Sequence, residues 1–299
     1  MVNTEINELI TKGRDEEENY AFFEAKRYFQ QALDRAEESK DKSLIVRCKL
    51  ALARVSRSLS DHHRSIDYYN EALELSKELE DTQSSVNAHI GLGITFRRIT
   101  NYEESLYHYK EALDLARKID SVVDIGKCLI NIGLVYIRLN RYEEAKEFLE
   151  KSIPIAEQTH DKKALSDIYA NLGTLYISLD DNIKGREHLE KAIQVIKDTG
   201  DIVRLSNCYI SLSVALKNLD EKDLAREYLE KALIIAKDVG DKDVQGRCYG
   251  NLGTLYSDSD PDYAKKYFSK ALELAIEIGD KELETISFTN LEVLKSKKR

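Results

Sequence analysis

The chain has 299 residues, of which 42% are hydrophobic and 33% are charged, and its formal net charge at pH 7 is −9. Such an acidic chain lacks the positive field that general nucleic-acid binding needs, so we expect no nucleic-acid partner. No stretch approaches the ~20 apolar residues that cross a bilayer, and the first residues do not resemble a leader peptide. We therefore expect a cytoplasmic protein without membrane insertion, and the scarcity of proline favours an all-α fold.

A motif that centres on a small residue recurs every forty residues along the chain. Its small residue falls at Gly13, Ala53, Gly93, Gly133, Gly173, Ser213 and Gly253. A second small residue keeps the same period, apart from one short step at the end, at Ala32, Ala72, Ala112, Ser152, Ala192, Ala232 and Ala271. A period of this length is typical of a stacked array, in which each repeat buries its apolar face on its neighbours.

Each repeat contains two blocks of apolar residues at three- and four-residue spacing, which predicts a helical hairpin. The hairpins are expected at about residues 3–40, 41–80, 81–120, 121–160, 161–200, 201–240 and 241–279, with a capping helix at 280–297. Aspartates at the expected starts of first helices predict N-caps, at Asp41, Asp81, Asp161, Asp201, Asp241 and Asp280. Gly200, Gly240 and Gly279 predict the left-handed residue that ends the preceding helix. We expect one domain over residues 1–299.

The fourth repeat carries the motif in full, with Leu129, Ile132, Gly133, Tyr136, Ala145, Leu149 and Ser152. This pattern resembles the tetratricopeptide repeat, and the match covers essentially the whole chain. The family's usual period is about 34 residues. The longer period looks like the long-repeat branch typified by the Pins/LGN adaptors and, more loosely, kinesin light chain. The resemblance implies a right-handed superhelical solenoid in which the first helices line a concave groove.

The cysteines and histidines form no recognisable reactive or metal-binding set. Multiples of forty residues separate the cysteines, which predicts one shared, buried helix position for Cys48, Cys128, Cys208 and Cys248. Equivalent positions in neighbouring repeats lie too far apart for a disulfide. The histidines lack metal-ligand spacing, and no nucleophile stands beside a recognisable base. We expect no cofactor, no metal and no enzymatic activity.

The resemblance assigns six positions around the motif glycine to the groove wall. In the first four repeats these positions hold two acids, Glu17 and Glu18, against the basic residues Arg14, Arg47, Arg54, Arg57, Arg97, Arg98, Lys127 and Arg138. The same positions balance in the last three repeats. Basic residues concentrated on one face of an acidic chain predict an acidic or phosphorylated ligand. Alternatively, these side chains pair with acids on neighbouring second helices or are solvated.

A row of asparagines falls two residues before the motif glycine or its equivalent, at Asn131, Asn171, Asn251 and Asn290. An asparagine side chain offers both a donor and an acceptor, so such a row can hydrogen-bond the main chain of an extended peptide. The resemblance implies that use. Other repeats break the row, and the alternative is that these amides bond only to adjacent helices.

The leading hypothesis is an adaptor that holds an acidic polypeptide segment in its groove. A second hypothesis is a regulatory protein that senses a signal peptide, and a third is a structural protein that associates with itself. All three are non-enzymatic, and the sequence names no partner.

Overall fold

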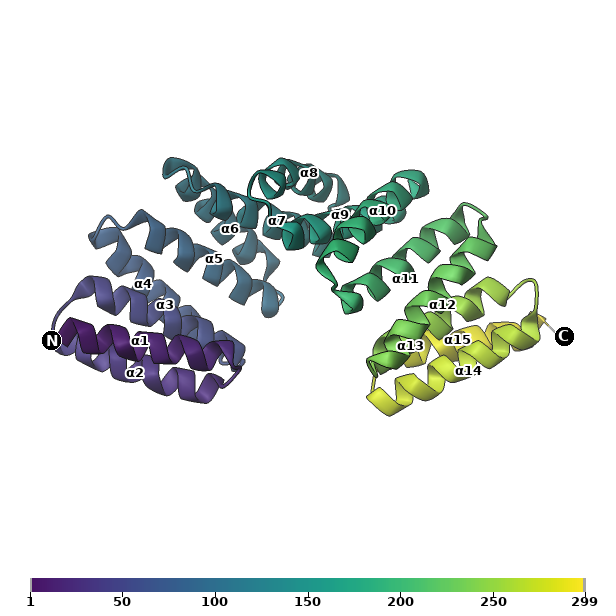
Figure 1. The fold of residues 1–299 in the computed structure, drawn as a ribbon, viewed down its shortest axis with the longest axis horizontal. Helices are drawn as coiled ribbons and strands as arrows, with labels where there is room; N and C mark the ends of the chain where they lie inside the picture. The colour runs from purple at the N-terminus through teal and green to yellow at the C-terminus, as the bar shows by residue number, and fades with distance from the viewer. Residues whose placement is uncertain (1, 298–299) are drawn as a thin grey trace. The chain divides into compact units, whose positions relative to one another are not determined.

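The computed structural model describes residues 2–297, so Met1, Lys298 and Arg299 of the expected 1–299 domain lie outside the described residues. All of the regular structure within that range is helical (Figure 1). The helices are α1 (Val2–Glu18), α2 (Phe22–Glu38), α3 (Lys42–Ser58), α4 (His62–Glu78), α5 (Thr82–Arg98), α6 (Tyr102–Lys118), α7 (Val122–Arg138), α8 (Tyr142–Gln158), α9 (Lys162–Ser178), α10 (Asn182–Thr199), α11 (Ile202–Asn218), α12 (Lys222–Asp238), α13 (Lys242–Tyr256), α14 (Pro261–Ile278) and α15 (Lys281–Lys297). The predicted all-α fold of seven hairpins and one further helix is confirmed.

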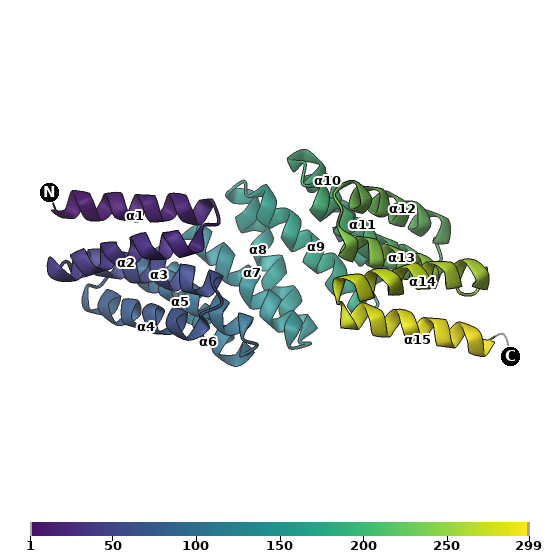
Figure 2. The same ribbon diagram turned by 90° about the horizontal axis from the view of Figure 1, so that it is seen from below.

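The chain divides into two compact units, which we call the N-terminal unit and the C-terminal unit. The first ends at Ile155 and the second begins at Ala156, so the division falls inside α8. Within each unit, consecutive helices run antiparallel and pack side by side in chain order, as Figures 1 and 2 show. The single domain over 1–299 stays a prediction. None of the described helices is both long enough and apolar enough to span a bilayer.

Short connections with a fixed backbone pattern set the length of each helix. Each predicted aspartate N-cap accepts a hydrogen bond from the backbone N–H three residues later, at 2.9–3.1 Å. Gly200, Gly240 and Gly279 adopt the predicted left-handed conformation, with φ of 72–73°. Ten further connections between the described helices place a non-glycine residue there, from Tyr20 to Asp220, with φ of 52–63°. A left-handed residue with a Cβ costs on the order of 1 kcal/mol, and no glycine predicted that conformation at these positions.

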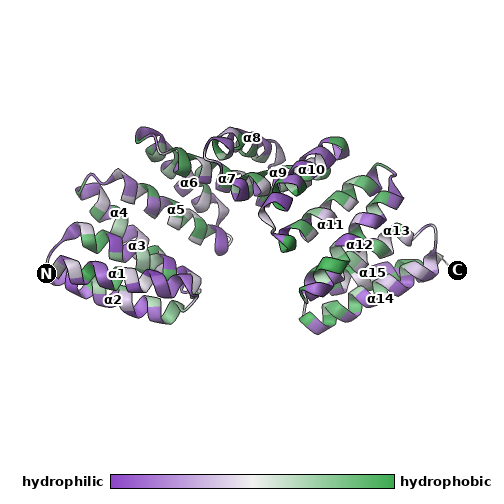
Figure 3. Cartoon of the chain, in the orientation of Figure 1, coloured by the Kyte–Doolittle hydropathy of each residue, from purple (hydrophilic) through white to green (hydrophobic). Residues whose placement is uncertain are grey.

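Each hairpin closes through one tight contact between its two helices. A Cβ added at Gly133 would lie 2.8 Å from the Leu149 side chain, and one added at Gly93 would lie 2.7 Å from the Tyr109 ring. Both distances are shorter than any real contact of a Cβ atom, so the first helix needs a glycine to come this close. The motif glycine therefore serves helix packing at these positions. Hydrophobic residues alternate with hydrophilic ones along the helices, as an array with one buried stripe per helix requires (Figure 3).

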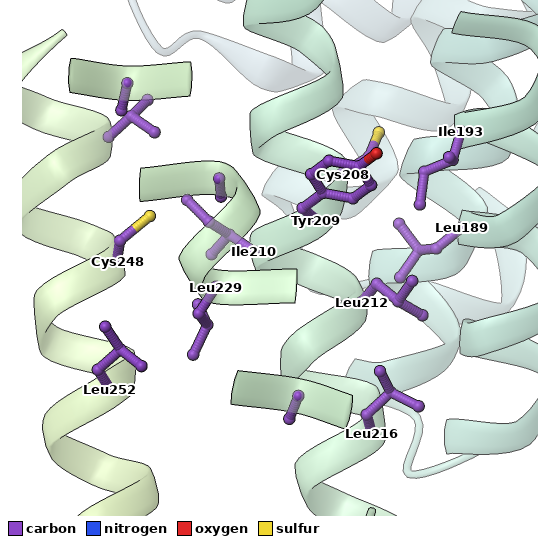
Figure 4. Close-up of a cluster of buried hydrophobic side chains, with 14 of the residues drawn as sticks. Leu189, Ile193, Cys208, Tyr209, Ile210, Leu212, Leu216, Leu229, Cys248 and Leu252 are labelled. Atoms are coloured by element: carbon purple, nitrogen blue, oxygen red, sulfur yellow. The ribbon is translucent and has the colours of Figure 1, made fainter. Parts of the chain in front are cut away.

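All four cysteines are buried free thiols at the equivalent helix position, as predicted. Figure 4 shows Cys208 and Cys248 among the leucines and isoleucines of one hydrophobic cluster in the C-terminal unit. Burial raises the pKa of each thiol to about 12, which keeps it protonated and unreactive near neutral pH.

His89 of α5 and His108 of α6 form a buried pair in the N-terminal unit. Their Nδ1 atoms lie 3.0 Å apart, and the Phe96 ring stacks on His108. Desolvation lowers the pKa of both imidazoles to about 4, and the positive charges of His108 and Lys77 add to the effect on His89. Within the described residues, no group of three potential ligands could hold a metal ion here or elsewhere.

This pair should make the fold sensitive to mild acid. Because both folded-state pKa values lie below the ordinary value of about 6.5, the unfolded chain binds protons first, and stability falls as pH drops from about 6.5 towards 4. The slope is up to about 1.4 kcal/mol per pH unit for each imidazole. The double variant H89L/H108F, which copies Leu129 and Phe148 of the fourth repeat, should flatten this dependence in urea unfolding between pH 7 and 4.5. Replacing the exposed His63 with Gln should leave it unchanged, and an unaltered slope in the double variant would contradict the assignment.

Two glycines of α13 allow the role of glycine in helix packing to be tested separately from its low helix propensity. A Cβ at Gly253 would meet the Phe268 ring at 2.7 Å, whereas the nearest atom to a Cβ at Gly250 is 4.0 Å away. We expect G253A to destabilise the protein by about 1–3 kcal/mol because the hairpin must open. We expect G250A to stabilise it by about 0.5–1 kcal/mol, since alanine is the better helix former. Chemical denaturation of the two variants checks both signs.

Candidate functional site: a basic groove in the N-terminal unit

A cavity of about 370 Å³ lies between α1, α3 and α5 of the N-terminal unit. Its polar lining comprises Arg14, Arg47, Arg54, Arg57, Tyr69, Ser84 and Asn87. All but Tyr69 belong to first helices of hairpins, and the motif spacing turns them to the same side. The structure therefore brings together four of the arginines predicted for the groove and adds a tyrosine from the second helix α4. We call this surface the basic groove.

Two of the predicted basic residues are neutralised by neighbouring acids. Arg54 donates two hydrogen bonds to the Glu17 carboxylate, from Nε at 2.6 Å and from Nη2 at 2.7 Å. This hydrogen bonding raises the pKa of Arg54. Lys127 lies 3.0 Å from the Asp124 carboxylate on the same helix. Arg54 and Lys127 therefore pair within the protein, although Glu17 and Asp124 lie on first helices and not on the neighbouring second helices that the alternative named.

The other predicted arginines have no ion pair with any carboxylate that the structure describes. Arg47 donates to the amide oxygen of Asn7 at 2.9 Å, and Arg57 donates to the Tyr69 hydroxyl at 2.9 Å. Arg98 donates to the backbone carbonyl of Arg57 at 3.4 Å. Neutral partners fix these side chains without cancelling their charge. The set without a described carboxylate partner is Arg14, Arg47, Arg57, Arg97, Arg98 and Arg138.

Two arginines of the C-terminal unit lie close to acids. Arg247 lies 3.9 Å from Asp243 and donates to Asn207 at 2.8 Å. Arg204 lies 3.1 Å from Asp167 and 3.4 Å from Asp201. These two arginines thus differ from Arg47 and Arg57, whose hydrogen-bond partners are neutral.

Three of the predicted asparagines each make the same type of side-chain hydrogen bond. Asn131, Asn171 and Asn251 each donate from Nδ2 to the carbonyl four residues earlier in their own helix, at 2.7–2.9 Å. The Oδ1 of Asn131 also accepts a hydrogen bond from the Tyr109 hydroxyl of the adjacent helix α6, at 3.3 Å. Asn290 of α15 lines a small cavity with Thr254, Ser257 and Phe268. A contact of these amides with a ligand stays a prediction.

Sequence reasoning missed the polar partners that hold the arginines in place. The pair Asn7 and Arg47 recurs as Asn207 and Arg247, with forty residues between its members in both cases. The pair Arg57 and Tyr69 has a counterpart in Arg97 and Tyr109, forty residues later. Both signals exist in the sequence as paired positions at the repeat period, and only the contacts identify them as pairs.

Models of the tetratricopeptide repeat match residues 46–79, 84–158, 166–199 and 205–239, which together are more than half of the chain. The chain belongs to the tetratricopeptide repeat family. No curated protein is similar enough in sequence to count as a match.

Solved structures agree with this family at low sequence identity. A STAND protein of Pyrococcus horikoshii with a tetratricopeptide repeat sensor matches with a TM-score of 0.80 and 18% identity, over 93% of this chain and 44% of that one. The apo quorum sensor NprR from B. thuringiensis matches with a TM-score of 0.67 and 14% identity, over 97% and 87%. Kinesin light chain-like repeats from Podospora anserina match with a TM-score of 0.55 and 14% identity, over 65% and 96%. At these identities the likeness shows the fold of a tetratricopeptide repeat protein and nothing finer.

Proposed function

We propose that the basic groove binds an acidic segment of another polypeptide, and that the protein acts as a non-enzymatic adaptor. The observation that carries the proposal is the set of groove arginines without carboxylate partners in a chain of net charge −9. Acids are plentiful in this chain, so leaving these guanidinium groups unpaired favours an external anion. Arginine also presents a rigid fork of donors that matches a carboxylate.

The groove is prepared for its ligand before binding. Asn7 holds Arg47, and Tyr69 holds Arg57, so less side-chain freedom is lost when a carboxylate arrives. Membership of an interaction-repeat family supports the general role of protein binding. A cytoplasmic location belongs to the same proposal, since the four free thiols suit a reducing compartment.

Two alternatives rest on specific observations. The matched proteins of P. horikoshii and B. thuringiensis are a repeat sensor and a quorum sensor, which supports the hypothesis of a regulatory protein that senses a signal peptide. Small-angle scattering that shows compaction on peptide binding would favour it over a rigid adaptor. Self-association is favoured by the exposed apolar residues Ile286, Phe288 and Val293 of α15. It predicts a mass that rises with concentration in sedimentation.

The adaptor proposal is tested with fluorescein-labelled decapeptides that carry alternating Glu, Gln or Lys, by anisotropy at low and high salt. We expect only the Glu peptide to bind, and its affinity to fall as salt screens the charges. The variant R47A/R57A/R97A/R98A should weaken this binding at least tenfold, because it removes four cations that have no carboxylate partner among the described residues.

The matched control is R27A/R35A/R64A/R117A, which removes the same charge from second helices of the N-terminal unit. Each of these arginines already has an acidic neighbour. We expect the control to bind within about threefold of the unmodified protein. Equal losses of affinity in the two variants would show that binding depends only on net charge. The proposal of a groove site would then be abandoned.

A further inference from the structure

One arginine–tyrosine pair, Arg57 and Tyr69, lines the basic groove, and an equivalent pair follows in the next repeat. In the second repeat, Arg57 Nη1 lies 2.9 Å from the Tyr69 hydroxyl, and its guanidinium carbon lies 5.9 Å from the centre of the ring. Tyr69 is only 4% exposed, so its hydroxyl is the part of a core residue that reaches the groove. Gly91 of α5 gives it room, since a Cβ there would lie 2.2 Å from Tyr69 Cζ.

The third repeat places Arg97 and Tyr109 at the equivalent positions. Tyr109 is fully buried, and its hydroxyl donates to Asn131 Oδ1 at 3.3 Å. Burial raises the pKa of Tyr109 to about 12, while the positive charge of Arg97 opposes that rise. Arg97 Nε is buried and has no hydrogen-bond partner in the described structure. Neither Arg57 nor Arg97 has a carboxylate partner there, so the positive charge of each arginine is not cancelled by an acid.

Helix packing does not explain the two hydroxyl groups. At the tyrosine position the other repeats carry residues without one, Phe29, Leu149, Leu189, Leu229 and Phe268, and their hairpins close in the same way. Moreover, none of these repeats has an arginine twelve residues earlier. A buried hydroxyl needs a partner, and for Tyr69 that partner is Arg57. Tyr69 therefore orients Arg57, and the repeat places Tyr109 at the equivalent position, where the charge of Arg97 acts on it.

We propose that the Arg57–Tyr69 and Arg97–Tyr109 pairs are two carboxylate subsites, and that the ligand is an extended polypeptide with acidic residues three positions apart. This rests on the proposed function and specifies its ligand. Each subsite offers one guanidinium group, which suits the single charge of a carboxylate better than the double charge of a phosphate.

The spacing follows from the distance between the two helices that carry the subsites. The hydrogen bond from Arg98 to the Arg57 carbonyl shows that the ends of α3 and α5 are neighbours, and packed helices lie ~8–10 Å apart. A polyproline II segment rises about 3.1 Å per residue with three residues per turn, so residues i and i+3 share one face ~9 Å apart. On an α-helix, residues seven positions apart share one face about 10.5 Å apart, so the preferred spacing of acidic residues distinguishes the two ligand conformations.

The test uses labelled decapeptides of Gln, Ser and Pro in which two Glu residues are one to seven positions apart, with a single-Glu peptide as reference. We expect the three-residue spacing to bind at least fivefold tighter than every other spacing. Y69F/Y109F should reduce that preference to less than twofold while keeping the rings that close the hairpins. Y68F is the matched control, because the Tyr68 hydroxyl contacts Gln30 of α2 instead, and it should keep the preference.

The outcomes separate this inference from the proposed function. Glu-rich peptides that bind without a spacing preference, or with an optimum at seven residues as in a helix, would overturn the two-subsite assignment and leave the acidic-ligand proposal standing. A phosphoserine pair that binds over tenfold tighter than the Glu pair would overturn the assignment to carboxylates. Failure of every acidic peptide to bind would remove the proposed function itself, and this inference with it.

Discussion

Every other feature of this protein depends on one close contact, between a residue with little or no side chain on the first helix of a hairpin and a bulky one on the second. Gly93 against Tyr109 and Gly133 against Leu149 are two instances. The contact brings the two backbones together and fixes the rotation of each first helix. Because that rotation is the same in every repeat, residues at equal distances from the motif position turn towards the same side. A surface formed by these residues therefore repeats with the period of the sequence.

The basic groove carries positive charge although the chain as a whole is acidic. An acidic chain has many carboxylates with which to neutralise an arginine, and Glu17 does this for Arg54. Arg57 stands at the position that Glu17 occupies one repeat earlier, and it meets a phenol instead of a carboxylate. A neutral partner orients a guanidinium group but leaves its field intact, so the groove remains positive beside a surface that is acidic overall.

The period of forty residues was enough to predict the hairpins, their N-caps and the buried cysteines, because these follow from local spacing and local backbone chemistry. It could not predict the left-handed residues at Tyr20 or Lys40, where no glycine marks the turn and the tight connection alone imposes the conformation. Nor could it predict which arginines would be neutralised. The partner of Arg54 is 37 residues away, and the separation of the two side chains is set by the packing of α1 on α3.

The second and third repeats show that core packing and groove chemistry are not independent here. A phenylalanine or leucine at the tyrosine position would close the hairpin equally well, but it would end inside the core. A tyrosine side chain extends past this contact, and the residue next to its hydroxyl determines which group the hydroxyl binds. Next to Gly91, which has no side chain, the hydroxyl of Tyr69 accepts a hydrogen bond from Arg57, whereas next to Asn131 the hydroxyl of Tyr109 donates to the amide oxygen. Buried tyrosines of the second helices therefore contribute to the polarity of the groove. Their low exposure alone would assign them to the core.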